Sequence, residues 1–159
     1  MGIVRYLVPL CVALCMAAPS IAQTVSNLSA SGTGTGSYDG SETTTASGTL
    51  EGKSAGTWQF NFTSIFSDGN GKVPVGCGPG AGTLVLTEAQ GTVSLSLVGW
   101  VCQWNGSGQP LNPNVIHVGY AITGGTGKLS NVIGGTGTVA MTLTSGTSAV
   151  LYVNGNIER

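Results

Sequence analysis

Charged side chains are scarce in this sequence. Lysine and arginine together number 5, aspartate and glutamate number 6, and the formal net charge of the 159 residues is −1. Nucleic-acid-binding proteins carry clustered basic residues on one face, and anionic lipid surfaces attract clusters of the same kind. The sequence contains no such cluster, so we expect no nucleic-acid partner and no anionic membrane surface as a partner.

Helical periodicity is also lacking, whereas glycine is abundant. Glycine and proline together make 33 residues (27 + 6), which is below the roughly 25–30% typical of disordered low-complexity chains. Most of the polar residues are threonine, serine and asparagine. Threonine favours strands, and glycine, serine and asparagine favour turns. The composition therefore predicts a folded, all-β chain of the kind found among exported proteins.

The residues that metals and cofactors need are nearly absent. His117 is the single histidine and no Cys-x-x-Cys pair occurs, so we predict no metal site. The run Gly124–Gly137 contains Gly-Gly-Thr-Gly twice and invites comparison with a phosphate-binding loop. However, Ile122 stands where that motif needs its first glycine and Leu129 where it needs a hydroxyl group. We therefore predict no cofactor and assign no catalytic residue.

The N-terminal segment, residues 1–22, has the pattern of a secretory signal peptide. Arg5 supplies a positive start, an apolar run follows from Leu7 to Ala18, and Ser20 and Ala22 are small residues at the −3 and −1 positions of a cleavage site. The run is too short to span a bilayer well. We therefore expect cleavage after Ala22 and a secreted or periplasmic protein, with no transmembrane segment in the mature chain.

Only two cysteines remain after the expected signal peptide, Cys77 and Cys102. An isolated pair in an exported chain is most simply a disulfide. The bond would close a loop of about 25 residues and add on the order of 3 kcal/mol to the free energy of unfolding.

Alternating apolar and polar residues predict strands over most of the remaining chain. The clearest alternation is at Thr57–Ser64, where Trp58, Phe60 and Phe62 share one face. The other predicted strands are Thr43–Glu51, Lys72–Val75, Thr83–Glu88, Thr92–Trp100, Val115–Thr123, Thr138–Thr144 and Ala149–Ile157.

Short turns join most of these strands, which favours antiparallel neighbours. Residues 41–159 are predicted to form a single antiparallel up-and-down β-barrel of about eight strands, with a β-sandwich as the alternative. An outer-membrane barrel fits less well, because the aromatic residues form no girdles. Residues 23–40 are predicted to be a flexible lead-in rich in glycine, serine and threonine, and Gly76–Gly82 a loop.

The segment Tyr120–Leu129, with a glycine turn and a further strand behind it, resembles the allene oxide cyclase and dirigent barrels. Those proteins carry a similar strand followed by Gly-Gly-Thr-Gly, a lysine or arginine, and an aromatic residue; Leu129 stands in the aromatic position here. The likeness covers Val115–Ala140. It implies an eight-stranded, calycin-like barrel, in agreement with the strand pattern. The motif is structural in that family, whose catalytic residues we do not place on this chain.

Four residues are candidates for contacting a ligand inside such a barrel: Trp58, Phe60, His117 and Tyr120. The aromatic residues could line a pocket or fill the core. His117 lies on the strand face opposite Tyr120 if the alternation holds.

Three functions are consistent with these observations. The leading one is a small exported protein that binds an apolar small ligand or acts at the cell envelope. The resemblance suggests a second, a cyclase or isomerase acting on a reactive apolar substrate, and a barrel filled by Trp58, Phe60 and Leu95 would argue against it. The third is a structural or adhesive surface protein, which exposed side chains at Trp100 and Trp104 would favour. The sequence leaves the oligomeric state open.

Overall fold

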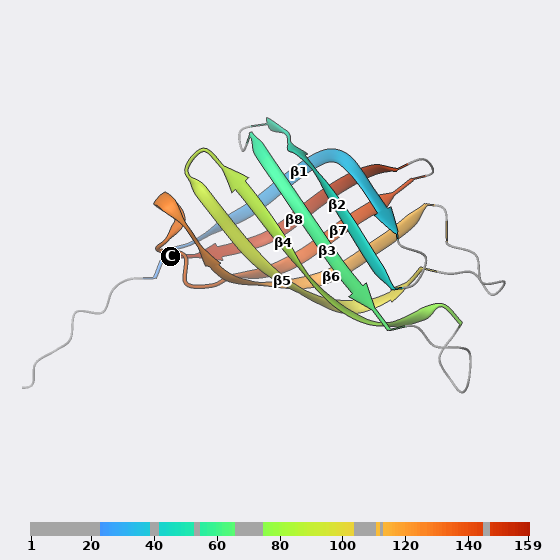
Figure 1. The fold of residues 1–159 in the computed structure, drawn as a ribbon. Coiled ribbons are helices and arrows are strands. Elements are labelled where there is room, and N and C mark those ends of the chain that lie inside the picture. Colours follow the sequence, from blue (N-terminus) through green and yellow to red (C-terminus); the bar gives the residue numbers. More distant parts are fainter. Residues whose placement is uncertain are drawn as a thin grey trace, which may run out of the picture.

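A computed structural model describes residues 23–38, 42–52, 55–65, 75–103, 111, 113–144 and 147–159. They form eight strands and one short 3₁₀ helix, η2 (Figure 1). The elements are β1 (Val25–Tyr38), β2 (Thr43–Leu50), β3 (Gly56–Ser64), β4 (Cys77–Glu88), β5 (Gly91–Cys102), β6 (Asn114–Gly125), η2 (Gly127–Leu129), β7 (Thr136–Leu143) and β8 (Ser148–Glu158). Within this described part, no helix is long and apolar enough to cross a membrane.

The strands close into one barrel in sequence order, each antiparallel to the next. β8 returns to pair with β1, in a register that runs from Val25 opposite Glu158 to Thr35 opposite Ser148. This confirms the predicted single antiparallel up-and-down barrel. Closure pairs the two outermost strands with each other, so that neither exposes a full-length edge despite the small number of charged residues.

The prediction of a flexible lead-in at residues 23–40 is wrong, because Val25–Tyr38 is the first strand of the barrel. The apolar alternation did not predict this strand, because three of its inward positions are Gly32, Gly34 and Gly36 and not large apolar residues. The segment therefore lacks the apolar alternation that marks the other strands. The barrel domain starts at residue 25 and not at residue 41.

A second correction concerns Gly76–Gly82, which was predicted as a loop and belongs almost entirely to β4. Pro79 lies within this strand and has no N–H to donate, but its carbonyl accepts a hydrogen bond from the backbone N–H of Ile65 at 3.0 Å. Of the predicted short strand at 72–75, Val75 lies in a turn and the rest is outside the described residues, as is the expected signal segment 1–22.

Large apolar side chains from β3 to β8 fill the interior. Those with essentially no exposed surface include Trp58, Phe62, Leu84, Leu95, Leu97, Ile116, Met141, Val139 and Leu151. Inward glycines lie where the rings need room: a Cβ on Gly32 would come within 2.6 Å of Trp58 Nε1, and one on Gly80 within 2.4 Å of the Phe62 ring. Small and large residues thus complement each other across neighbouring strands, as close packing of a core requires.

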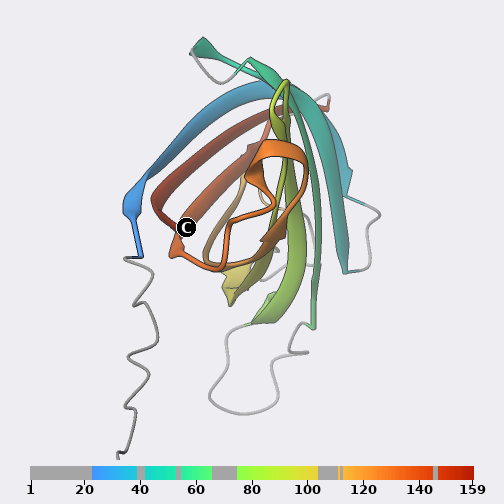
Figure 2. The same ribbon diagram turned by 90° about the vertical axis from the view of Figure 1, so that its left-hand side faces the viewer.

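The glycine-rich connection between β6 and β7 crosses one end of the barrel (Figure 2). Leu129 and Val132 are buried beneath it, whereas Ile133 is exposed. Gly127 has a φ of 62°, and a Cβ there would lie 2.5 Å from the carbonyl oxygen of Gln90 in the β4–β5 turn. Glycine is needed both for the conformation and for this close approach, which ties the connection to the turn.

Candidate functional site

The four residues predicted to contact a ligand do not form one site. Trp58, Phe60 and Tyr120 face the interior and are at most 5% exposed, whereas His117 is exposed on the outer face of β6. The strand alternation therefore separates His117 from the other three. Leu95 also lies in the interior and is 1% exposed. Trp58, Phe60 and Leu95 together therefore fill the barrel, which argues against a substrate cavity inside it.

Tyr120 is held by packing and by one backbone contact. Its hydroxyl donates a hydrogen bond to the carbonyl oxygen of Asn156 at 3.4 Å, and its ring covers Gly137 and Gly155, where an added Cβ would lie within 2.7 Å of the tyrosine side chain. Burial raises the pKa of the Tyr120 phenol. The phenol is therefore neutral at ordinary pH.

The predicted cysteine pair is at bonding distance. Cys77 begins β4 and Cys102 ends β5, the two residues are directly opposite in the register, and their sulfur atoms lie 2.01 Å apart. Cys77 is buried and Cys102 is exposed. The bond lies on the outer face of the barrel and joins two neighbouring strands where the ladder ends. A disulfide is compatible with an extracellular location.

A buried polar cluster, missed by sequence reasoning, closes the end of the barrel opposite η2. Gln103 Nε2 donates to Thr44 Oγ1 at 3.0 Å, and Ser64 Oγ donates to Gln103 Oε1 at 3.0 Å. All three side chains have no exposed surface. Gln103 follows β5 and thereby links that strand to β2 and β3. Because each of these groups has a partner, the cluster fits a structural role better than a binding role.

The motif Gly-x-Ser-x-Gly occurs at Gly52–Gly56, a match that sequence reasoning overlooked. In hydrolases this motif places a nucleophilic serine on a sharp turn between a strand and a helix. Its serine, Ser54, lies outside the described residues, but the elements on either side of the motif are β2 and β3, two strands of one antiparallel sheet and not a strand and a helix. The structural context of a nucleophile elbow is therefore missing.

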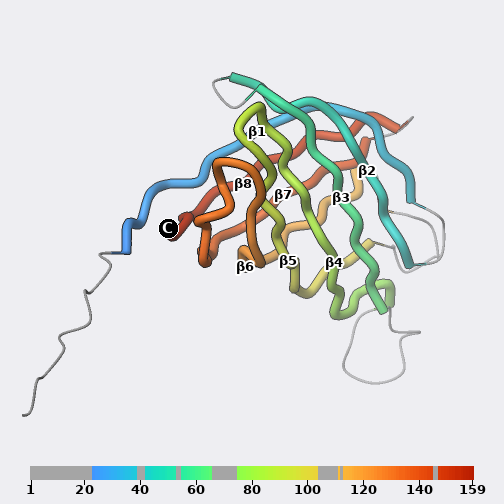
Figure 3. Tube along the Cα trace, turned by 60° about the vertical axis from the view of Figure 1, so that its left-hand side comes forward, coloured from blue at the N-terminus to red at the C-terminus, as the bar shows by residue number. Residues whose placement is uncertain are grey.

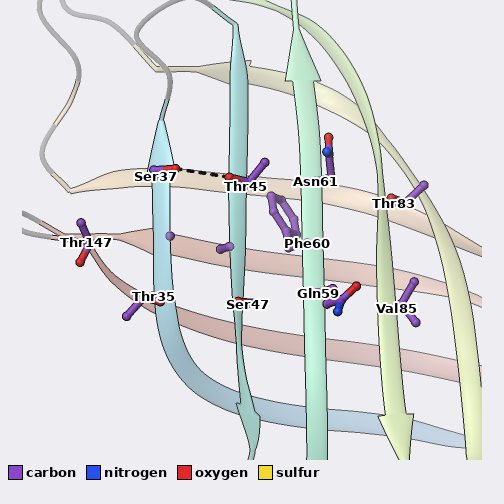
Figure 4. Close-up of a pocket in the computed structure, with 12 residues that line it drawn as sticks. Thr35, Ser37, Thr45, Ser47, Gln59, Phe60, Asn61, Thr83, Val85 and Thr147 are labelled. Atoms are coloured by element: carbon purple, nitrogen blue, oxygen red, sulfur yellow. Dashed lines mark hydrogen bonds between the residues drawn. The ribbon is translucent and has the colours of Figure 1, made fainter.

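An open depression of about 710 Å³ lies on the outer face of β1–β4 (Figure 4). Its described lining residues are Thr35, Gly36, Ser37, Thr45, Ala46, Ser47, Gln59, Phe60, Asn61, Thr83, Val85 and Thr147. None of these residues is charged, and most end in a hydroxyl or an amide. We call the outward side chains of this depression the hydroxyl face.

The strand register arranges the hydroxyl face in two rows. One row is Ser37, Thr45, Asn61 and Thr83, and the next is Thr35, Ser47, Gln59 and Val85. Neighbouring strands lie about 4.8 Å apart, so each row spans roughly 14 Å. The hydroxyl oxygens of Ser37 and Thr45 lie 3.3 Å apart, within hydrogen-bond distance. The rows present both donors and acceptors to a ligand, because hydroxyl and amide groups serve as both.

Thr147 stands at the rim of the hydroxyl face in an unusual backbone conformation. Its φ is 88°, which makes it the one non-glycine residue with positive φ among those described. Its carbonyl accepts a hydrogen bond from the N–H of Gly36 at 2.8 Å. A β-branched residue in this region is strained, and such strain clusters at functional positions.

The hydroxyl face had a signal in the sequence that sequence reasoning did not use. In residues 33–37, 43–49, 57–63 and 83–87 nearly every second residue is threonine, serine, asparagine or glutamine. That alternation indicates polar outward faces. It does not indicate which of these strands lie side by side.

Apolar side chains are exposed elsewhere on the outer surface. Trp100 on β5 is 54% exposed, and Val98 on the same strand and Val115 on β6 are exposed as well. Pro79 lies directly opposite Trp100 in the register. Trp104, the other tryptophan considered for this role, lies outside the described residues. We call Val98, Trp100 and Val115 the apolar strip.

Within the described part of the chain, no group of three or more His, Cys, Asp or Glu residues is placed to hold a metal ion. No family model, no curated protein and no solved structure matches this chain.

Proposed function

We propose that this is an exported, non-enzymatic protein of the cell envelope or its surroundings that binds an uncharged, hydroxyl-rich partner, such as a polysaccharide, at its hydroxyl face. The observation that carries the proposal is the depression on β1–β4, whose described lining residues are uncharged and mostly hydroxyl- or amide-bearing. Export is supported by the N-terminal pattern of residues 1–22 and by the Cys77–Cys102 pair.

The chemistry of the lining selects the class of partner. Phosphorylated or carboxylated ligands are typically held by arginine or lysine, and the lining has neither among its described residues. Apolar ligands are held by pockets with predominantly apolar walls. Hydroxyl and amide groups instead exchange hydrogen bonds with the hydroxyl groups of a ligand, directly or through water. Rows about 14 Å long suit a chain of sugar units better than one small molecule.

The interior gives the apolar-ligand function less support. Trp58, Phe60 and Tyr120 pack into the core, and the bulky side chains of Leu95 and Leu97 fill the same space. A cyclase of the kind suggested by the resemblance needs room for its substrate inside the barrel, so the same packing weakens that alternative. The outer surface is the stronger candidate.

The test is co-sedimentation of the purified exported protein with insoluble cellulose, chitin, starch and peptidoglycan. We expect retention on at least one of them. The double variant Gln59→Ala/Asn61→Ala should weaken that binding about tenfold or more, because two hydrogen-bonding amides are lost at about 1 kcal/mol each. The matched control is Thr136→Ala/Thr138→Ala, which changes two exposed threonines on the outer face of β7.

Two results would contradict the proposal. One is no retention on any of the four polysaccharides; the other is equal loss of binding in the β3 and the β7 variants. Export is tested separately, by sequencing the N-terminus of the protein recovered from outside the cytoplasm, which we expect to begin at Gln23.

The apolar strip favours a second candidate function, that of a structural or adhesive protein. An exposed tryptophan, an exposed valine two residues before it on the same strand (Val98, 65% exposed) and a further exposed valine on the neighbouring strand form a surface that other apolar surfaces would cover. Concentration-dependent self-association measured by sedimentation, abolished in Trp100→Ser, would support it. A monomer at all concentrations would count against self-adhesion.

A further inference from the structure

The first half of β1 has a hydrogen-bonding partner on one side only. β1 pairs with β8 from Val25 onward, but its pairing with β2 begins at Gly32. In Figure 3 the first half of β1 continues past the point where β2 turns away. Residues 25–30 therefore form a strand edge that no other described strand pairs with.

The register identifies which backbone groups are free on this edge. Thr24 and Arg159 exchange both backbone hydrogen bonds at 2.9 Å, so Thr24, and by alternation Ser26 and Leu28, direct their N–H and C=O groups to the β8 side. The carbonyl of Ser31 accepts a hydrogen bond from the N–H of Glu51, on the opposite side.

The odd-numbered residues Val25, Asn27 and Ser29 therefore direct their backbone groups away from β8. These groups have no partner among the described residues. They amount to three N–H donors and three C=O acceptors on one edge.

The edge is accessible and uncharged. Val25, Ser26, Asn27 and Ser29 are exposed, and residues 25–31 include no charged side chain. Charged residues, prolines and bulges are the usual means by which proteins block pairing at a free edge. Residues 25–30 have none of these three features. Only the shortness of the free segment limits pairing at this edge.

A depression lies on each side of this edge. On the barrel side, a depression of about 170 Å³ has four apolar lining residues, Leu28, Val93, Leu129 and Ile157, and five polar or charged ones, Ser26, Asn27, Ser29, Glu88 and Arg159. On the outer side, about 490 Å³ is lined by Ser29, Ser31, Glu51, Tyr152 and Asn154, together with Ala30 and Val153. The side chains of a strand point alternately to its two faces. A strand laid along β1 would meet, on the inner side, a recess in which Leu28, Val93, Leu129 and Ile157 adjoin the polar side chains of Ser26, Asn27, Ser29, Glu88 and Arg159. On the outer side it would meet a more polar recess with one exposed tyrosine.

We propose that the free edge of β1, at residues 25–30, binds an extended peptide segment of another protein by β-strand addition. The backbone groups of Val25, Asn27 and Ser29 bind the peptide backbone, and the recess formed by Leu28, Val93, Leu129 and Ile157 takes an apolar side chain of the peptide. Backbone hydrogen bonds supply affinity in this mode of recognition, and pockets for alternate side chains supply specificity. The site is independent of the hydroxyl face.

A single peptide strand fits this edge better than a second copy of the barrel. In a second copy β1 is already paired with β8, so its edge arrives with a sheet attached. The inner recess is enclosed by residues of β1, β4, β5, η2 and β8, and it holds about 170 Å³. That space accommodates the side chain of one added strand and not a second sheet.

The first experiment is amide hydrogen exchange by NMR on the purified full-length exported protein, with a blocked heptapeptide of alternating threonine and valine as the probe. In the free protein we expect fast exchange at Val25, Asn27 and Ser29 and slow exchange at Ser26 and Leu28. Saturating peptide should slow exchange at the three odd positions at least tenfold and leave the other two unchanged.

Two controls separate strand addition from nonspecific adsorption. The first is the same heptapeptide N-methylated at alternate residues, which cannot donate along one edge and should bind at least tenfold more weakly. The second is Asn27→Pro, which removes one N–H from the free edge without removing a β8 hydrogen bond; it should weaken binding of the unmodified peptide by a similar factor. The peptide control needs no folded variant.

The proposal is overturned by any of three outcomes. They are equal binding of the methylated and unmethylated peptides, protection spread over residues away from β1, and protection of Val25, Asn27 and Ser29 in the free protein that rises with protein concentration. The last would mean that a second copy occupies the edge.

Discussion

Two opposite walls of the barrel use the same alternation with different residues. β1 and β2 lie across the barrel from β5 and β6. The inward residues of the first wall include Gly32, Gly34, Gly36, Ala46 and Gly48, and those of the second include Leu95, Leu97, Ile116, Val118 and Tyr120. The first wall directs threonine and serine outward, whereas the second exposes the apolar strip.

This contrast shows that a segment can form a strand of the barrel when the sizes of its residues complement those on the neighbouring strand, even if its own residues are not apolar. Gly32 contributes no side chain to the core, yet its position is filled because the Trp58 ring lies against it. The first wall, which we call the glycine wall, therefore depends on side chains of β3 to fill the core beside it. The second wall fills its part of the core with its own large side chains. Substitutions that change the size of one partner test this dependence.

The largest effect is expected from Trp58→Ala. Removing the ring leaves a cavity beside Gly32 and Gly48, which have no side chains to fill it, so we expect a loss of about 3–5 kcal/mol in the free energy of unfolding. Leu97→Ala on the opposite wall is the comparison, with an expected loss of about 2–5 kcal/mol. Urea denaturation of both variants measures the difference. A loss below about 1 kcal/mol for Trp58→Ala would show that the glycine wall collapses and does not depend on the ring.

The disulfide reinforces one side of this comparison, because it ties β4 to β5 and has no counterpart in β1 or β2. Its 25-residue separation predicts that Cys77→Ala/Cys102→Ala loses about 3 kcal/mol. Thermal unfolding of the variant, and of the wild-type protein with and without a reductant, measures this value. The variant should be insensitive to the reductant, and a wild-type protein that is equally insensitive would mean that the bond does not contribute.

Gly32→Ala tests the glycine wall directly. The new Cβ would lie 2.5 Å from the carbonyl oxygen of Thr49 and 2.6 Å from Trp58 Nε1, so we expect a loss of about 1–3 kcal/mol from overpacking. Gly119→Ala is the matched control, since its Cβ would meet nothing closer than 3.6 Å. That change should be neutral or stabilise by about 0.4–1 kcal/mol through the unfolded chain.

Combining Gly32→Ala with Trp58→Phe should recover part of the loss, because the smaller ring leaves room for the methyl group. Additive losses in that double-mutant cycle would show that the two positions are not coupled.

The smallest effect concerns Tyr120 on the second wall. Its phenol pKa is raised in the folded state, chiefly by burial. The folded state therefore retains the proton where the unfolded chain has released it. The contribution of Tyr120 to the free energy of unfolding is fully present below about pH 10, the pKa of a tyrosine in the unfolded chain. It is lost as the pH rises through the higher pKa of the folded state.

Denaturation midpoints between pH 9 and pH 11.5 should therefore fall more steeply for the wild-type protein than for Tyr120→Phe. Parallel curves would mean that the burial of this phenol has no energetic consequence.

The alternation of apolar and polar residues predicted the position of most individual strands. The prediction of Thr57–Ser64 differs from β3 by one residue, and that of Val115–Thr123 lies within β6. β1 and the first half of β4 were missed because glycine and proline occupy positions where the pattern needs apolar or β-branched residues. Signals of local flexibility were outweighed there by tertiary packing.

The candidate surfaces were harder to predict than the strands. Trp58, Phe60 and Tyr120 were candidates for contacting a ligand, but the alternation left open which strand faces point inward. Their neighbours in the barrel decide that the three side chains pack in a core. The hydroxyl face brings together residues from four strands, and the free edge of β1 exists only because β2 ends at Leu50, opposite Gly32. Neither can be derived from the spacing of residues along one strand.

The amino-acid sequence by itself determined an all-β chain of alternating faces, an isolated cysteine pair and the scarcity of charge, because these depend on composition and on a period of two residues. The tertiary structure decided that the barrel is filled, that polar residues of β1–β4 align in rows and that one strand edge stays open. The reason is that register and barrel closure depend on contacts between residues far apart in the chain. At these contacts the size of one residue limits the size of the residue packed against it.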